Sequence, residues 1–301
     1  MPHKHKILKQ SFVSLIFLLL LTGIVSAATE TSMSADNINY NVNTKKVTAI
    51  GNVVINRKDF TLWGDRGEGS TENQEFIIKG KVRGTFPSEK AELSHADSVK
   101  WLRSAENVKT DGSAEAVGSV LIKRGQNEKL IADYVRWKPG SIDYTARGNV
   151  NADLKDHLLL ADEVGRAGES FWGSNVKRYE NRVKKVGIKA ESVEGKIKGE
   201  NVTEFIATGN VVIDYLDKDG LKTTITGAKA VYSKDRGTVV ISGGAKAVRG
   251  DGKTVTSDTV VLHEDSKIIE AIGNSKITFV IDDKNTKKDA AKKEKDKKAG
   301  E

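Results

Sequence analysis

The fold is decided by a stretch near the start of the chain, residues 35–55, which reads ADNINYNVNTKKVTAIGNVVI. It opens on a small residue followed by an acid, Ala35-Asp36, and closes on a glycine that begins an apolar run, Gly51-Asn52-Val53-Val54-Ile55. Alternation of apolar and polar residues predicts a β-strand with one buried face. Because glycine and asparagine tolerate positive φ, the pair before the run indicates a turn.

Both landmarks recur along the chain, and four of the seven spacings between successive small–acid pairs are 29 residues. The recurrence predicts about eight units, each supplying two short strands. We interpret the recurring acid as a cap of a turn or strand start and not as a metal ligand. The pairs are Ala35-Asp36, Gly64-Asp65, Ala96-Asp97, Ala132-Asp133, Ala161-Asp162, Ala190-Glu191 and Ser257-Asp258, with Ala228-Lys229 in the same place. The glycines are Gly51, Gly80, Gly118, Gly148, Gly209, Gly243 and Gly273.

The fifth unit breaks the pattern. Lys177 stands where its glycine is expected, and Gly173 comes early. We therefore expect a distorted unit or an insertion over residues 172–186, a segment rich in lysine and arginine.

The second and fourth residues after each glycine, with the sixth in three units, form a predicted inward stripe. Such a stripe fits a trough that shields acyl chains, since each methylene removed from water is worth about 0.8 kcal/mol. It fits an ordinary packed β core equally well, and the residues alone leave both open. The candidate lipid-binding residues are Val53, Ile55, Val82, Phe86, Val120, Ile122, Val150, Val211, Ile213, Tyr215, Ile277 and Phe279.

The two ends of the chain differ from the repeats. Lysines at positions 4, 6 and 9 precede an apolar run, residues 12–25, and Val25-Ser26-Ala27 offers a cleavage site. We predict a cleaved signal peptide at 1–27 and export to the periplasm, with an uncleaved membrane anchor as the alternative. Residues 28–281 form the predicted repeat domain, and 282–301 a disordered Lys-rich tail.

Composition argues against several classes of function. Three lysines in residues 1–27 and a surplus of two positive charges in 282–301 leave only +3 of the formal +8 on the repeats. No basic face for nucleic acid is expected from so even a distribution. His95, His157 and His263 share no motif, and the chain has no cysteine. We expect no catalytic residue, metal or cofactor. The rival interpretations are a polysaccharide-active enzyme on a β-solenoid and a repeat-built surface or adhesin module.

Ala-Asp, about fifteen residues and then Gly-Asn-Val-x-Ile, repeated after a signal-like segment, resembles the OstA-like proteins of lipopolysaccharide transport. The resemblance covers roughly residues 34–281 and is closest to the soluble periplasmic bridge proteins of the LptA type, with an anchored LptC-like relative as the alternative. The best matching segments are 35–55, 132–150, 191–213 and 257–277.

The resemblance implies an open, V-shaped antiparallel β-jelly roll, here of about sixteen short strands, whose apolar interior carries the acyl chains of lipid A. It also implies head-to-tail assembly of several copies. The implied partners are lipopolysaccharide, an inner-membrane LptC-like component and an outer-membrane LptD-like translocon. Sixteen strands folded into two facing layers would span about 40 Å at the usual strand spacing.

Overall fold

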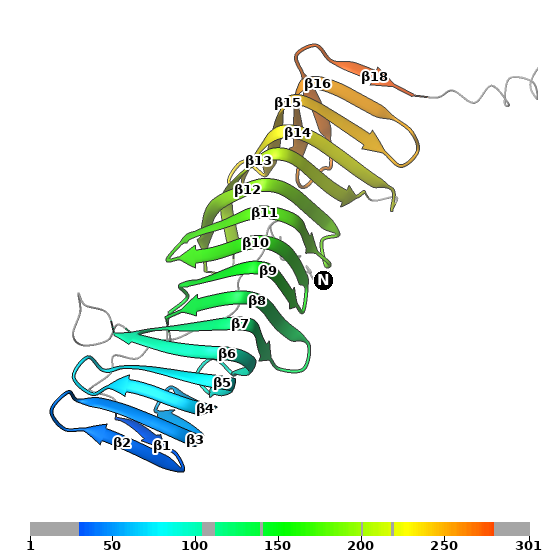
Figure 1. Ribbon diagram of the computed structural model, residues 1–301. Coiled ribbons are helices and arrows are strands. Elements are labelled where there is room, and N and C mark those ends of the chain that lie inside the picture. The colour runs from blue at the N-terminus through cyan, green and yellow to red at the C-terminus, as the bar shows by residue number, and fades with distance from the viewer. Residues whose placement is uncertain (1–29, 104–111, 139–140, 200, 218–219, 280–301) are drawn as a thin grey trace, which may run out of the picture.

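The computed structural model describes residues 30–103, 112–138, 141–199, 201–217 and 220–279, and these form one sheet of 18 strands (Figure 1). The predicted signal peptide and Lys-rich tail lie outside the described residues. The strands are β1 (Thr31–Ser34), β2 (Asn37–Asn41), β3 (Lys46–Arg57), β4 (Phe60–Ser70), β5 (Glu75–Phe86), β6 (Ala91–Arg103), β7 (Gly112–Arg124), β8 (Glu128–Trp137), β9 (Tyr144–Leu154), β10 (His157–Ala167), β11 (Ser170–Asn181), β12 (Val186–Lys198), β13 (Asn201–Leu216), β14 (Lys222–Ser233), β15 (Thr238–Arg249), β16 (Thr254–His263), β17 (Ile269–Ile272) and β18 (Lys276–Thr278).

The strands form an antiparallel meander. From β3 to β16 each strand pairs with the next one in sequence. At the two ends, β1 and β2 pair with the two halves of β3, and β17 and β18 with the two halves of β16. The expected open, antiparallel all-β fold is confirmed, and the β-solenoid fold named for the rival enzyme is wrong.

The prediction of about sixteen short strands needs correction in one respect. The 18 strands occupy sixteen levels, because the first and last levels are each broken in two, but β3 to β16 are 10 to 16 residues long. Each long strand arches across the whole molecule and contributes to both of its sides (Figure 1). The sheet is therefore a single stack of sixteen levels, which extends roughly 70 Å at about 4.8 Å per strand.

The arch is made by the recurring glycine. Between β3 and β4, Ile50 pairs with Arg66 and Val53 with Gly64, so Gly51 and Asn52 together oppose one residue. This is a β-bulge, with φ of +79° and +47° at the two residues, and a bulge bends its strand. The bulge recurs on alternate strands. The bend divides the sheet into arm I, on the side of residues 46–50 of β3, and arm II, on the side of residues 53–57.

The recurring acid holds this bend. Asn149 Nδ2 donates to Asp133 Oδ2 at 3.0 Å, and a Cβ added at Gly148 would lie 2.3 Å from the same oxygen. The carboxylate thus occupies the space that a side chain at the bulge would need. The same packing of an acid on a bulge glycine recurs at Gly51, Gly80, Gly118, Gly209 and Gly273.

The fifth unit is distorted, which was one of the two expectations for residues 172–186, and the other expectation, an insertion, is wrong. Those residues form most of β11, the turn after it and the start of β12. Asn175, with φ of +46°, donates to Asp162 at 2.7 Å across only 13 positions, against 16 positions for Asn149 and Asp133. Lys177 pairs with the same carboxylate at 2.6 Å. The bulge is therefore retained on a shorter hairpin, without its glycine.

Replacing Gly148 with alanine should destabilise the protein by about 2 kcal/mol or more, because positive φ is unfavourable for alanine and the new Cβ meets Asp133. The matched control is Gly125→Ala, since Gly125 also has positive φ but has open space around its Cβ position. Its cost should be about 1 kcal/mol. Urea unfolding measures both, and equal losses would show that the acid does not crowd the bulge.

Candidate functional site

Two facing rows of apolar side chains run through the whole stack, one on each arm. Their members sit directly opposite one another on successive strands, so each row is continuous across all sixteen levels. The arm II row is Met33, Ile55, Leu62, Gly84, Leu93, Ile122, Leu130, Ala152, Leu159, Tyr179, Ile188, Ile213, Ile225, Ala247, Val255 and Ile277. The arm I row is Ile38, Ala49, Gly67, Ile78, Val99, Ala116, Val135, Ala146, Val164, Gly173, Val193, Ala207, Ala230, Ile241, Val260 and Ala271.

Most of the predicted stripe faces this interior. The members that are at most 3% exposed are Val53, Ile55, Val82, Phe86, Val120, Val150, Val211, Ile213 and Tyr215. Ile122 is partly buried and packs against the same core. These residues lie on arm II at five different strands, and all of them belong to the core between the two arms.

The stripe is not buried at the end of the stack. Ile277 and Phe279 are 61% and 52% exposed, which corrects the expectation that they are covered. Ile277 nevertheless faces inward, because it sits opposite Val255, which packs on the core. No strand of the described chain follows β18 to cover it. At the other end, Ile38 and Tyr40 are 48% and 45% exposed, and Ile38 sits opposite the buried Ala49.

Each arm ends, away from the bend, in a row of strand ends and turns, here called its free edge. The free edges of the two arms are offset along the stack. Phe60, on β4 of arm II, packs against Trp101, on β6 of arm I, with ring centroids 5.4 Å apart. Phe86 of β5 likewise meets Trp137 of β8 at 5.3 Å, edge to face. Arm II therefore contacts arm I strands that lie two or three positions later in the sequence. As a consequence, inward-facing apolar residues of arm I are left open at the β2 end, and those of arm II at the β18 end.

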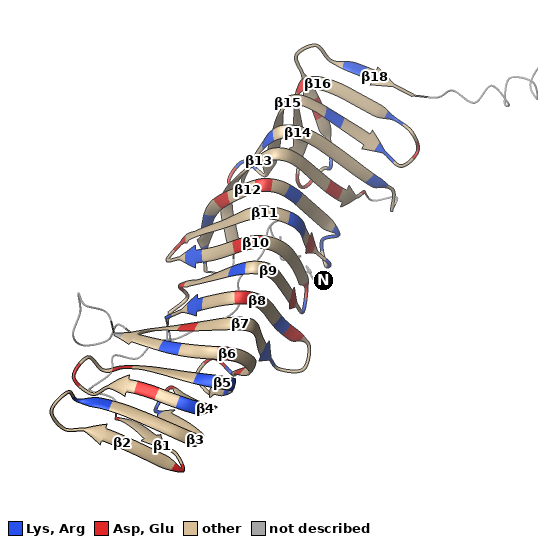
Figure 2. Cartoon of the chain, viewed as in Figure 1, with Lys and Arg blue, Asp and Glu red and all other residues tan. Residues whose placement is uncertain are grey.

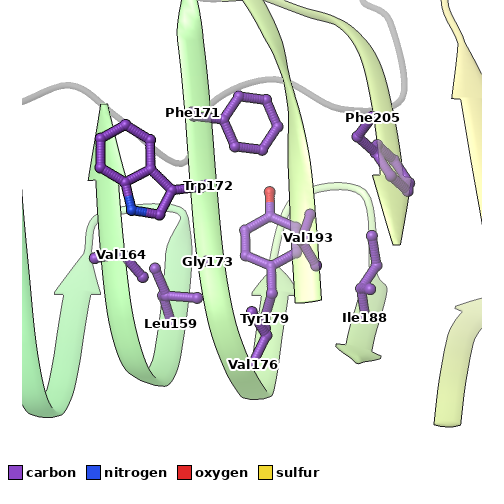
Figure 3. Close-up of a pocket in the computed structure, with 10 residues that line it drawn as sticks. All are labelled: Leu159, Val164, Phe171, Trp172, Gly173, Val176, Tyr179, Ile188, Val193 and Phe205. Carbon is purple, nitrogen blue, oxygen red and sulfur yellow. The ribbon is translucent and has the colours of Figure 1, made fainter. Parts of the chain in front are cut away.

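A pocket opens between the arms near the middle of the stack, where β10 to β13 meet (Figure 3). Arm II contributes Tyr179 and Ile188, and arm I contributes Phe171 and Val193. The cavity volume is about 30 Å³, room for about two water molecules. The full lining is Leu159, Val164, Phe171, Trp172, Gly173, Val176, Tyr179, Ile188, Val193 and Phe205.

The side chains that line the pocket carry no charge. Burial raises the pKa of Tyr179, so its hydroxyl stays neutral, and that oxygen lies 3.1 Å from His157 Nδ1. Burial also lowers the pKa of His157, which favours its neutral form at neutral pH. An uncharged apolar surface of this kind is suited to hydrocarbon and not to ionic ligands.

Sequence reasoning found the arm II half of the interior and missed arm I and the pocket. The pocket residues Phe171, Tyr179 and Phe205 were not among the candidates. The missing signal was the alternation before each glycine, seen in Val47 and Ala49 on β3, which continues in the same phase through the two-residue bulge to Val53 and Ile55.

The outer surface carries both charge signs. Lysine and arginine, and aspartate and glutamate, are scattered along the arches in the view of Figure 2. Among the described residues, His95, His157 and His263 lie on β6, β10 and β16, and His95 and His263 are each beside an acid, at 3.6 and 3.4 Å. Within the described ranges no group of three or more metal-ligating side chains occurs. In the same part of the chain, no helix is long and apolar enough to cross a membrane.

No family model and no curated protein matches this sequence. Thirteen chains of solved structures match it. One of them is LptH of Pseudomonas aeruginosa, described as the LptA-homologous periplasmic component of the lipopolysaccharide transport device. It is 15% identical over an alignment that covers 52% of this chain and 96% of LptH, with a TM-score of 0.29.

Proposed function

We propose that this chain is a periplasmic bridge protein of lipopolysaccharide transport, which shields the acyl chains of lipid A between its two arms. The observation that carries the proposal is the pair of continuous apolar rows, which would offer hydrocarbon an unbroken path along roughly 70 Å of stacked strands. Half of the arm I row is alanine or glycine, which leaves more room between the arms than branched side chains would. The resemblance to OstA-like proteins supports the same assignment.

The open ends support a role in a longer assembly. Each end exposes apolar side chains, Ile38 and Tyr40 at one and Ile277 and Phe279 at the other. The arm I overhang at the β2 end complements the arm II overhang at the β18 end. Another copy, or a related fold at either membrane, would continue the sheet by strand addition and the rows by contact. In this proposal the flanking partners are an LptC-like component at the inner membrane and an LptD-like translocon at the outer membrane.

The test is the lipid that accompanies the protein. The full chain, produced as an exported protein in a Gram-negative host and purified without detergent, should yield lipid A species in its organic extract by mass spectrometry. Fluorophore-labelled lipopolysaccharide should bind it and compete with unlabelled lipopolysaccharide. An unrelated periplasmic protein purified in parallel is the control. Absence of lipid A together with absence of binding would contradict the proposal, and a bound polysaccharide would favour the enzyme interpretation.

A further inference from the structure

The free edges of the arms meet through polar contacts in the C-terminal half of the molecule. Lys184, in the turn between β11 and β12, belongs to the edge of arm II. Its Nζ lies 3.7 Å from Oε1 of Glu264, which follows β16 at the edge of arm I. Tyr232 of arm I donates its hydroxyl to Oε2 of the same carboxylate at 3.2 Å. Lys267 lies three residues beyond Glu264, and its Nζ is 5.9 Å from the ring centroid of Tyr215 on arm II.

These groups are partly withdrawn from water. The side chains of Lys184 and Glu264 are only 15% and 10% exposed. Burial lowers the pKa of Lys184 to about 8 and raises that of Glu264, because desolvation disfavours the charged form of each group. In such a pair the Coulomb attraction and the desolvation penalty nearly cancel. The contact therefore holds the edges in register but can be separated at little net cost, unlike the buried ring packing of Phe60 on Trp101.

The turn that carries Lys184 is also attached to the central pocket. The strands on either side of it supply Tyr179 and Ile188 to the pocket wall. Asn181 Oδ1 accepts the backbone N–H of Lys184 at 2.8 Å, which ties the turn to the end of β11. An outward movement of this turn would thus carry the arm II wall of the pocket with it. At the tip of the turn, the apolar side chain of Val183 is 64% exposed.

We infer that Lys184, Glu264, Tyr232 and Lys267, here called the seam clasp, are the movable closure of the trough. The clasp opens to let an acyl chain pass sideways between the arms into the central pocket, and then closes over it. This assigns a role to the basic turn at residues 182–185, which the repeat pattern did not explain. The inference rests on the proposed function, because it concerns how the same interior is filled.

Reversing one charge of the clasp tests it. Because the chain has no cysteine, Val183→Cys and Ser266→Cys place two spin labels on opposite edges of the seam without competing sites. In this background Lys184→Glu should lengthen the label distance and speed uptake of fluorophore-labelled lipopolysaccharide about tenfold, because attraction becomes repulsion. The double reversal, Lys184→Glu with Glu264→Lys, should restore both quantities. Tyr232→Phe should change both in the direction of Lys184→Glu, by less.

The matched control is Lys196→Glu, which reverses an ion pair of 3.2 Å whose members, Lys196 and Glu204, both belong to arm I. It should change neither the distance nor the uptake rate. If wild-type protein binds lipopolysaccharide but neither distance nor rate responds to Lys184→Glu and Tyr232→Phe, the clasp is wrong and the proposed function stands. If no variant takes up lipid, whatever its label distance, both the proposed function and the gating role are wrong.

Discussion

Replacing Ile213 with aspartate should cost about 5 kcal/mol or more in unfolding free energy and abolish lipid binding. Ile213 is 1% exposed and stands in the arm II row, between Ile188 on β12 and Ile225 on β14. Loss of the apolar side chain alone costs roughly 2–5 kcal/mol, and a carboxylate with no cation beside it adds a further penalty. Domains of ordinary stability have only about 5–15 kcal/mol to lose.

The control lies one residue earlier. Val212 faces outward, is partly exposed, and sits opposite Lys189 and Thr226. Val212→Asp introduces the same charge on the same strand and should cost about 1 kcal/mol or less. Urea unfolding followed by circular dichroism, together with lipopolysaccharide binding, measures both variants. Similar losses for the two would mean that the interior at β13 is not a sealed apolar row.

Blocking one end of the stack should stop assembly completely. We expect wild-type protein to grow in mass with concentration, because the two ends form a heterologous contact that does not close on itself. Ile38→Arg places a charge on the inward face at the β2 end, and Ile277→Arg does so at the β18 end. Each variant alone should remain monomeric at every concentration in light scattering.

Mixing the two blocked variants provides the decisive measurement. The free β18 end of Ile38→Arg can dock on the free β2 end of Ile277→Arg, so an equimolar mixture should form dimers and nothing larger. Ile50→Arg is the control, because Ile50 is 58% exposed but lies on the outer face of β3, and this variant should assemble as the wild type does. Wild-type protein that stays monomeric, without cross-links to membrane components, would argue for a shuttle and against a bridge.

The local alternation after each glycine was enough to predict the strands and the arm II half of the interior. Val53 and Ile55 are read correctly because period two is a property of a few adjacent residues, and the glycine fixes its phase. Arm I was missed although its inward positions keep the same phase across the bulge, with Ala49 and Val53 four residues apart. Many of its inward residues are alanine or glycine, which give no apolar signal in a sequence.

Other features depend on partners that are distant in sequence. Ile277 has the right alternation, yet it is exposed because β18 is the last strand among the described residues, and the pattern of one strand cannot reveal its neighbours. The pocket combines Tyr179 with Phe205, and the seam clasp combines Lys184 with Glu264. Both arise from the offset between the arms, which no local motif encodes. An insertion was considered for the fifth unit because Asn175 forms the bulge there without the usual glycine.

The meander has a consequence for how this protein acquires its structure. Each strand finds its partner in the next segment of the chain, so loop closure is cheap at nearly every step, and folding can begin at any hairpin and spread in both directions. For an all-β protein this gives an unusually low contact order and favours fast folding. Contacts that cross between the arms, such as Lys184 with Glu264, join distant segments and form only after many hairpins have stacked. The hydrogen-bonded stack of strands would therefore be complete before the free edges of the two arms come together.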